Sequence, residues 1–184
     1  MQPTTRIAVT VTFLRIDQPN PAPQSLPEGT DLVRVERCSV AFYRYLYGTV
    51  GGPYLWWLRR SLSDEVIGSM LRAPVVSIYV LYRGGAPAGF FELDMTGRPA
   101  INLSYFGLMP EAVGLGIGRS FLDAALETAW QAGARAITVN TCTADHPRAL
   151  PNYLRVGFHR VRAVDEVWDI PNRLGLTIPA HLRA

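Results

Sequence analysis

Three glycines stand where an anion-binding turn would need them. The segment Asn102–Gly118 has the pattern of a strand that passes through a loop into a helix, and Gly114, Gly116 and Gly118 lie where that helix begins. Glycine lets a backbone approach a ligand closely. The first amides of a helix have no internal partner and carry the positive end of the helix dipole. The sequence therefore predicts an anion-binding turn over residues 113–118.

Two common nucleotide-binding motifs do not fit this turn. A dinucleotide fold requires GxGxxG and an acidic residue at the end of the next strand, whereas this chain places Arg119 at the third glycine position and ends that strand at Cys142 without an acid. A Walker loop requires GK[ST], and the chain contains no lysine. Taken alone, the segment is equally compatible with a plain strand-to-helix turn.

The stretches that follow the turn carry a family resemblance. The loop VGLGIGRSFL, the strand AITVNTCTADH and the segment HPRALPNYLRVGF resemble the core of the GNAT superfamily of CoA-dependent N-acyltransferases, over about residues 75–161. The family patterns [QR]xxGxG/A and NxxAxxxYxxxGF are matched here by Val113, Gly116, Gly118, Ala149, Tyr153, Gly157 and Phe158. The chain departs from them at Val113, where glutamine or arginine is usual, and at His146, where asparagine is usual.

The resemblance implies acetyl-CoA as the cofactor. Its pyrophosphate would lie on the main-chain amides of the turn, so the change at Val113 should matter little, whereas the change at His146 alters a hydrogen bond on the cofactor side. The end of the strand, Tyr105–Leu108, would lie along the pantetheine and offer amides to the thioester carbonyl. The cofactor-binding residues implied in this way are Phe106, Gly107, Leu108, Val113, Gly114, Leu115, Gly116, Ile117, Gly118, Arg119, His146 and Ala149.

Acetyl transfer to an amine also requires a proton donor and a proton acceptor. The resemblance places Tyr153 near the sulfur as the general acid. Some family members carry a glutamate on the fourth strand, but that position falls on Asn102 here, and an amide cannot take the proton. Glu92 and Asp94 share one face of the preceding strand, so either is a candidate base, directly or through a water. The alternative is a pair of solvated carboxylates.

Aromatic residues crowd the segment upstream. GNAT folds build the acceptor site from the first two helices and their connection, so the resemblance makes Tyr43, Tyr47, Trp56, Trp57 and Tyr105 candidate substrate-binding residues. Together with Glu92 and Asp94, such rings would suit a cationic amine. The alternative interpretation is that these aromatics pack the helices onto the sheet or form a homodimer contact.

The elements that must position these residues follow from hydrophobic periodicity and from glycine and proline breaks. The pattern predicts helices over about residues 32–47, 64–71, 118–133 and 147–156, and strands over 6–16, 75–82, 88–95, 100–108 and 136–141. One or two closing strands are expected over 158–169, and a proline-rich loop over 17–30. We expect Asp145 to cap the helix that follows it, rather than to form a dyad with His146. Pro151 fits that helix only within its first turn.

The summed pattern predicts a single α+β domain, with a mixed and mostly antiparallel sheet flanked by helices. The cofactor core would span about 75–161 and the acceptor-side helices about 31–72 of the 184 residues. Acetyl-CoA should enter where the strands ending near Leu108 and Thr141 diverge.

Composition narrows the function further. A net charge of +3 with scattered arginines does not indicate nucleic-acid binding, and we expect no metal site, no membrane association and a cytoplasmic location. The expected activity is N-acetylation of a small-molecule or amino-acid-like primary amine. The alternatives are a protein or peptide acceptor, and a non-catalytic acyl-CoA-binding module.

Overall fold

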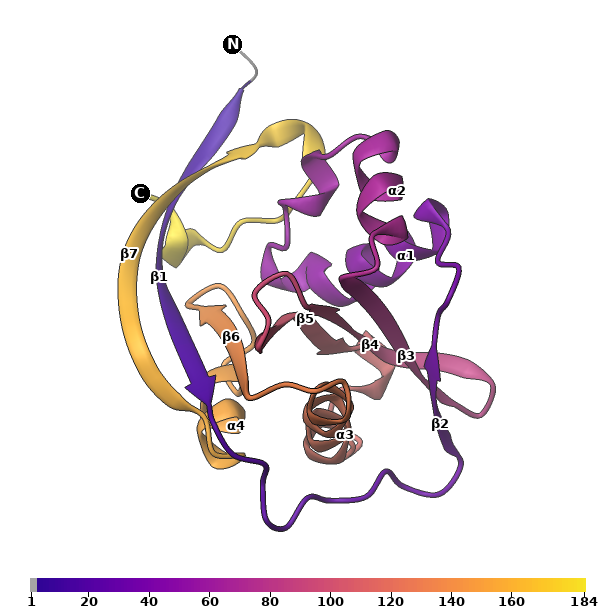
Figure 1. The fold of residues 1–184 in the computed structure, drawn as a ribbon. Coiled ribbons are helices and arrows are strands. Elements are labelled where there is room, and N and C mark those ends of the chain that lie inside the picture. The colour runs from indigo at the N-terminus through magenta and orange to yellow at the C-terminus, as the bar shows by residue number, and fades with distance from the viewer. Residues whose placement is uncertain (1–2) are drawn as a thin grey trace.

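A seven-stranded sheet runs through the computed structural model, which describes residues 3–184 (Figure 1). The strand order is β2-β3-β4-β5-β6-β1-β7. The bounds are β1 (Thr4–Ile16), β2 (Thr30–Arg34), β3 (Val76–Arg83), β4 (Ala86–Asp94), β5 (Ala100–Leu108), β6 (Ala136–Cys142) and β7 (His159–Pro171). Four α-helices flank it: α1 (Val40–Gly51), α2 (Asp64–Arg72), α3 (Gly118–Gln131) and α4 (Ala149–Arg155). The expected α+β class is confirmed.

The only parallel pairing among the named strands of residues 3–184 joins β5 to β6, and it is short. It runs from Ala100 opposite Ala136 to Asn102 opposite Thr138. Beyond these pairs β5 continues to Leu108 along β4, while β6 continues to Cys142 along β1. The two strands therefore diverge in the middle of the sheet, as expected from the sequence.

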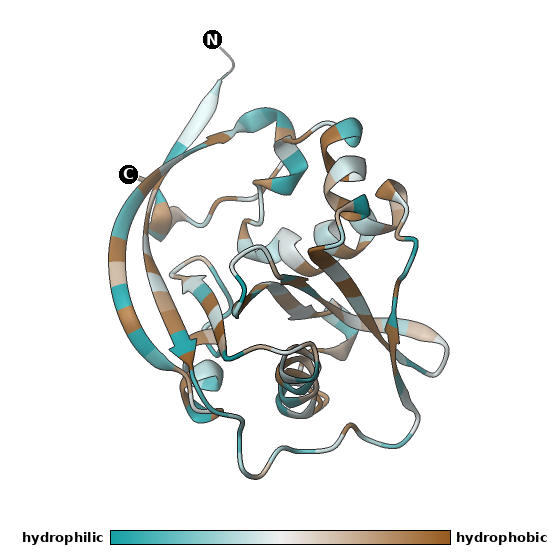
Figure 2. Ribbon diagram, viewed as in Figure 1, coloured by the Kyte–Doolittle hydropathy of each residue, from teal (hydrophilic) through white to brown (hydrophobic). Residues whose placement is uncertain are grey.

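Helices cover both faces of the sheet (Figure 1). The α1 and α2 face contains Tyr43, Leu46 and Phe90, and the α3 and α4 face contains Phe91 and Phe121. Adjacent residues of a strand point to opposite faces, so Phe90 and Phe91 serve different clusters. Figure 2 shows that the strongly hydrophobic residues concentrate on the central strands, where these two cores meet.

The N-terminal strand is inserted between β6 and β7. It pairs antiparallel with β6, where Val11 lies opposite Cys142. It also pairs antiparallel with β7, from Thr4 opposite Pro171 to Arg15 opposite His159. A third core cluster, which includes Ile7 and Ile170, closes this end of the sheet. A single long strand, β7, therefore occupies the place where one or two strands were expected.

The expected helix over 32–47 begins too early. Residues 30–34 form β2, which pairs antiparallel with β3, and the helix starts only after Ser39, whose side chain accepts a hydrogen bond from the Phe42 amide (3.2 Å). The helix also passes Gly48 and ends at Gly51. The apolar residues 32, 33 and 35 belong to an extended segment, which periodicity over so short a stretch does not distinguish from a helix.

The predicted helix over 147–156 is confirmed over the shorter range of α4. Pro151 lies in its first turn, where the missing amide would have no helical partner. The expected cap is wrong, because α4 begins without a side-chain cap. Asp145 instead accepts hydrogen bonds from the Thr141 hydroxyl (2.7 Å) and the Cys142 amide (3.0 Å) at the end of β6.

The proline-rich connection between β1 and β2 passes beside α3 and is anchored to it (Figure 1). The buried carboxylate of Asp123 accepts from the Asn20 side chain and from the Gln24 amide, both at 3.0 Å, and pairs with Arg119 at 2.8 Å. Among the described residues, no helix is long and apolar enough to cross a membrane, and no cluster of three or more potential metal ligands is present.

Candidate active site

A buried carboxylate lies between β4 and the helices that cover it. Glu92 has no exposed surface, and both of its oxygens are bonded. The Tyr43 hydroxyl of α1 donates to Oε2 at 2.6 Å, and the Arg59 guanidinium, from the short 3₁₀ helix Arg59–Ser61, donates to Oε1 at 2.8 Å. A buried carboxylate requires such partners, so Glu92 fixes the position of α1 and of the 3₁₀ turn together.

Arg59 extends this network to β5. Its guanidinium lies 5.5 Å from the centre of the Tyr105 ring, which packs edge-on against the Tyr47 ring at 4.9 Å. The Arg59 amide donates to the Tyr47 hydroxyl at 3.2 Å. A β-bulge between Glu92 and Leu93, opposite residues 103–105, aligns Tyr105 with Glu92 on the neighbouring strand. Two helical tyrosines, one arginine and two strand residues therefore form one connected cluster.

Burial sets the protonation of this cluster. It raises the pKa of Glu92, although Arg59 and the Tyr43 hydrogen bond act in the opposite direction. Burial also raises the pKa of Tyr43, Tyr47 and Tyr105, and the nearby Glu92 charge adds to the effect at Tyr43. The three phenols are therefore protonated at neutral pH, and the Glu92 carboxylate is poised to accept a proton more readily than an exposed one.

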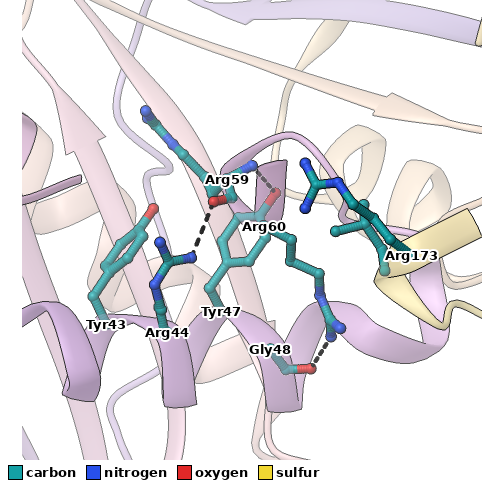
Figure 3. A pocket seen from close by; sticks show the side chains of 8 residues that line it. Tyr43, Arg44, Tyr47, Gly48, Arg59, Arg60 and Arg173 are labelled. Atoms are coloured by element: carbon teal, nitrogen blue, oxygen red, sulfur yellow. Dashed lines mark hydrogen bonds between the residues drawn. The ribbon is translucent and has the colours of Figure 1, made fainter. Parts of the chain in front are cut away.

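A cavity of about 310 Å³ opens above this cluster. Its lining residues come from α1, from the 3₁₀ turn and from the C-terminal segment: Tyr43, Arg44, Tyr47, Gly48, Arg59, Arg60, Arg173 and Leu174 (Figure 3). Pockets for small ligands start at about this size. Tyr43 and Tyr47, which the sequence indicated, thus line the cavity, and Tyr47 packs against Tyr105 of β5 with 4.9 Å between the ring centres.

The glycine turn has the geometry of an anion site. Gly114 and Gly116 have φ of 88° and 79°, values that favour glycine, and residues 113–116 are exposed. The helix α3 begins at Gly118 with no side-chain cap, so its first amides remain open to a ligand. These main-chain donors fit a diphosphate better than side chains would, because the sequence places no lysine here.

The end of β5 and the start of α4 both contact the α3-side core. Phe106 and Leu108 pack half-buried against the α3-side core, as Ala149 does at the start of α4. Gly107 lies under α1, where a Cβ would come within 2.4 Å of Val50. β5 therefore separates the α3 face, which carries the glycine turn, from the α1 face, which carries the cavity.

His146 replaces the usual asparagine without losing its local hydrogen bond. Its Nδ1 accepts from the Arg148 amide at 3.0 Å, as an asparagine oxygen would, and its ring meets Tyr54 edge-on at 5.8 Å. The neighbouring Asp145 accepts from the Trp56 indole at 3.3 Å. These two contacts attach the acceptor-side connection after α1 to the turn after β6, across the line where β5 and β6 diverge.

Tyr153 lies on the inner face of α4. It is 7% exposed, belongs to the α3-side core and packs edge-to-face on Phe158 at 5.6 Å. Burial raises its pKa, and the charge of Asp145 adds to this, so the phenol carries its proton at neutral pH. A protonated hydroxyl is the state that a proton donor requires.

The family relationship follows from sequence comparison. Residues 39–158 match the family described as Acetyltransferase (GNAT) family. The chain belongs to the GNAT acetyltransferase family. No curated protein sequence matches the chain.

Solved structures share the GNAT fold with this chain. A GCN5-related N-acetyltransferase from Kribbella flavida aligns with a TM-score of 0.61 at 14% identity, covering 90% of this chain and 60% of the other. One from Sphaerobacter thermophilus gives 0.60 at 19%, covering 92% and 53%. An aminoglycoside acetyltransferase from an uncultured soil metagenomic sample gives 0.57 at 14%, covering 70% and 88%. The chain spans only about 60% and 53% of the first two GNAT proteins.

Two other predicted positions of this GNAT domain have structural partners. Asn102, which stands where some family members carry glutamate, accepts from the Thr138 hydroxyl and donates to Ser104, both at 3.0 Å, and so joins β5 to β6 at their last pair. Asp94 accepts from the Thr96 amide at 2.8 Å and holds the turn after β4. Glu92, and not Asp94, is therefore the carboxylate in contact with a residue that lines the cavity.

The two tryptophans among the candidate substrate-binding residues, Trp56 and Trp57, do not line this cavity. Trp56 packs against Tyr47 and Tyr105 beneath the cavity, and Trp57 packs against Trp168 in the third core cluster, so neither ring lines the cavity. The cavity instead receives arginines that the sequence analysis did not assign. The Arg59–Arg60 pair after the aromatic cluster was a visible signal, whereas Arg173 is far away in sequence and gave none.

Proposed function

We propose that this protein transfers an acetyl group from acetyl-CoA to the primary amine of a small molecule. One observation supports this proposal: the open turn before α3 and the cavity lined by α1 and the 3₁₀ turn lie on opposite faces of the sheet, and β5 packs side chains into the cores on both faces. A cofactor held on one face and an acceptor held on the other would meet at that strand. The size of the cavity favours a small molecule over a protein chain.

When bound, acetyl-CoA supplies the acetyl group as an activated thioester. The amides at the start of α3, and of Gly114 and Gly116 before it, would bind the diphosphate. The end of β5, residues 106–108, presents main-chain amides that orient the pantetheine and the carbonyl oxygen. His146 keeps the start of α4 in place by accepting a hydrogen bond from the Arg148 amide.

The Tyr43–Glu92 pair removes the proton from the attacking amine. Tyr43 lines the cavity, and its hydroxyl is 2.6 Å from the Glu92 carboxylate. As the new nitrogen–carbon bond forms, the amine proton passes to the Tyr43 oxygen while the Tyr43 proton passes to Oε2 of Glu92. The raised pKa of Glu92, caused by burial, makes its carboxylate a stronger proton acceptor than an exposed one.

Tyr153 protonates the departing sulfur. Its hydroxyl, which is protonated at neutral pH, would donate its proton to the sulfur of bound acetyl-CoA, so that CoA would be released as the free thiol. The phenol is returned to its starting state by a proton from water once the products have left. One proton thus leaves the amine and one reaches the sulfur.

The test separates catalysis from simple binding. We expect acetyl-CoA to raise the melting temperature of the purified protein, because it binds the folded state alone. With a panel of small primary amines, we expect release of free CoA thiol together with an acetylated product detected by mass spectrometry. Stabilisation without thiol release for any amine or peptide would favour a non-catalytic acyl-CoA-binding protein. The absence of both effects would contradict the proposal.

A further inference from the structure

The two edges of the sheet differ in length. One edge is β2, with 5 residues, and the other is β7, with 13 residues, about twice the length of an average strand. β7 lies on the outside of the molecule (Figure 1) and, within residues 3–184, pairs only with β1. The amides and carbonyls along its outer edge therefore have no strand partner in this part of the chain. So long an open edge can pair with a strand of another chain.

The charges of β7 are separated along the strand. Its first half is basic and its second half is acidic, the titratable residues being His159, Arg160, Arg162, Asp165, Glu166 and Asp169. A parallel, in-register pair of two such strands would place Arg162 beside Arg162 and Asp165 beside Asp165. An antiparallel pair places the basic half of each strand along the acidic half of the other. Since opposite charges across strands stabilise a sheet and like charges destabilise it, the charge pattern favours the antiparallel pair.

Antiparallel hydrogen bonding limits the register of such a pair. The backbone groups that face outward alternate with those that face β1, so a two-fold axis must pass through a residue for the outward groups of both strands to meet. An axis at Val164 places Arg162 opposite Glu166 on both sides of the axis. An axis at Asp165 would oppose two carboxylates, and an axis at Ala163 would leave Arg162 opposite a valine. The axis at Val164 is therefore the most favourable of the three.

The part of β7 around Val164 is regular and accessible. The bulge in the β1–β7 ladder falls at Val161, so residues 162–171 pair with β1 without interruption. Arg162 is exposed, and its guanidinium lies 4.2 Å from the centre of the Phe13 ring. Glu166 is half-buried and accepts from the indole of Trp168 at 2.7 Å. Within residues 3–184, neither Arg162 nor Glu166 has an ion-pair partner within 4.0 Å, so both charges are available to another chain.

We propose that two copies of this chain pair antiparallel through β7, about a two-fold axis at Val164, so that one sheet continues across the dimer. Both copies use the same surface, as a two-fold interface requires. Each Arg162 forms an ion pair with Glu166 of the other copy. Val164 lies opposite Val11, on the face of β1 that carries the third core cluster. The two Val164 side chains therefore meet at the axis and extend that cluster from one copy to the other.

Charge reversal tests both the surface and the register. R162E alone and E166R alone each place like charges opposite one another on both sides of the axis. An equimolar mixture of the two variants restores opposite charges on both sides, because each strand then meets its complement. The matched control is R83E, which reverses an exposed arginine on β3, in the other half of the sheet.

Analytical ultracentrifugation over a range of protein concentrations measures the dimer. We expect wild type and R83E to dimerise with the same Kd, and each of R162E and E166R to raise the Kd by about 10-fold or more. The mixture should dimerise as tightly as wild type, which only folded strands can do, so recovery excludes unfolding as the cause of the loss.

Three results would overturn the proposal. A wild type that stays monomeric at every concentration would leave this edge to a different partner. A dimer that R162E and E166R do not weaken would use another surface. A dimer that both variants lose, with no recovery in the mixture, would contradict the pairing of Arg162 with Glu166. None of these outcomes depends on acetyl transfer, so the two proposals stand or fall separately.

Discussion

Two arginine–carboxylate pairs, one on each face of the sheet, look alike and do different things. In both Arg59–Glu92 and Arg119–Asp123 the nitrogen–oxygen distance is 2.8 Å, the arginine side chain is 24% exposed and the carboxylate is fully buried. Arg119 and Asp123 are one turn apart in α3, and Asp123 also receives a side-chain amide and a main-chain amide from residues 20–24. The Arg119–Asp123 pair therefore anchors the proline-rich connection between β1 and β2 to α3.

The pair under α1 joins distant parts of the chain instead. Glu92 lies on β4, Arg59 lies 33 residues earlier on a 3₁₀ turn, and the second partner of Glu92 is Tyr43 on α1. Both Tyr43 and Arg59 line the cavity, so the carboxylate is linked to a place where a ligand can enter. Equal burial and equal distance therefore do not show whether an ion pair has only a structural role, and the proposed role of Arg59–Glu92 depends on what else its partners contact.

The largest expected effect is a difference in the free energy of unfolding between variants of the two ion pairs. Arg59→Met should lower the free energy of unfolding by about 3–5 kcal/mol, because it leaves Glu92 buried with a single donor. Arg119→Met should cost clearly less, since Asp123 keeps two donors at 3.0 Å. Urea denaturation of both variants measures the difference. Equal losses would show that the extra donors of Asp123 contribute little, and recovery in Arg59→Met/Glu92→Gln would confirm the buried charge as the cause.

The next effect belongs to the face that carries the glycine turn. Tyr153→Phe keeps the ring in its core against Phe158 and removes only the hydroxyl that we propose as the proton donor. We expect kcat to fall about 100-fold while the affinity for acetyl-CoA, measured by calorimetry, changes less than about twofold. The variant should melt close to wild type. Unchanged kcat would remove Tyr153 from the chemistry, whereas a parallel fall in affinity and stability would reduce it to core packing.

The sequence was informative about this face for a physical reason. Its turn depends on main-chain amides and on glycines with positive φ, and such features leave local marks such as Gly114, Gly116 and the start of α3. The order of β3, β4 and β5, and α3 itself, were predictable from patterns within single segments, whereas the divergence of β5 from β6 was predicted with the help of the family resemblance. β2 was missed because five residues are too few for periodicity to distinguish strand from helix.

The cavity beside α1 was less predictable because its lining side chains come from segments that are far apart in the chain. Arg173 reaches the cavity only because β7 carries the chain back to this end of the molecule. Nothing in residues 170–175 indicates such a neighbour. The insertion of β1 between β6 and β7 is likewise a pairing of distant segments, for which local pattern contains no information.

A smaller effect is expected from backbone strain at the glycine turn, where a loss of stability can be separated from a loss of CoA binding. Gly116→Ala places a side chain at φ 79° with no neighbouring atom to clash, so its cost is backbone strain of about 1–2 kcal/mol. Gly29→Ala, at φ 76° and equally free of clashes, is the matched control in the proline-rich connection. Both should lose similar stability, but only Gly116→Ala should weaken CoA binding, by up to about tenfold. Equal CoA binding in the two variants would contradict a phosphate site at this turn.

The smallest expected effect concerns the thiol reactivity of the two cysteines, Cys38 and Cys142. Burial, helped by the charge of Glu92, raises the pKa of Cys38 to about 11, and burial with the charge of Asp145 raises that of Cys142 to about 12. A raised thiol pKa lowers the thiolate fraction, to roughly one in a thousand or less at pH 8, and only the thiolate reacts. The folded protein should therefore react with a disulfide reagent over hours at pH 8 and about tenfold faster per pH unit above it, while the denatured protein reacts at once. Fast reaction of one native thiol, located by peptide mapping, would show that its side of the sheet opens in solution.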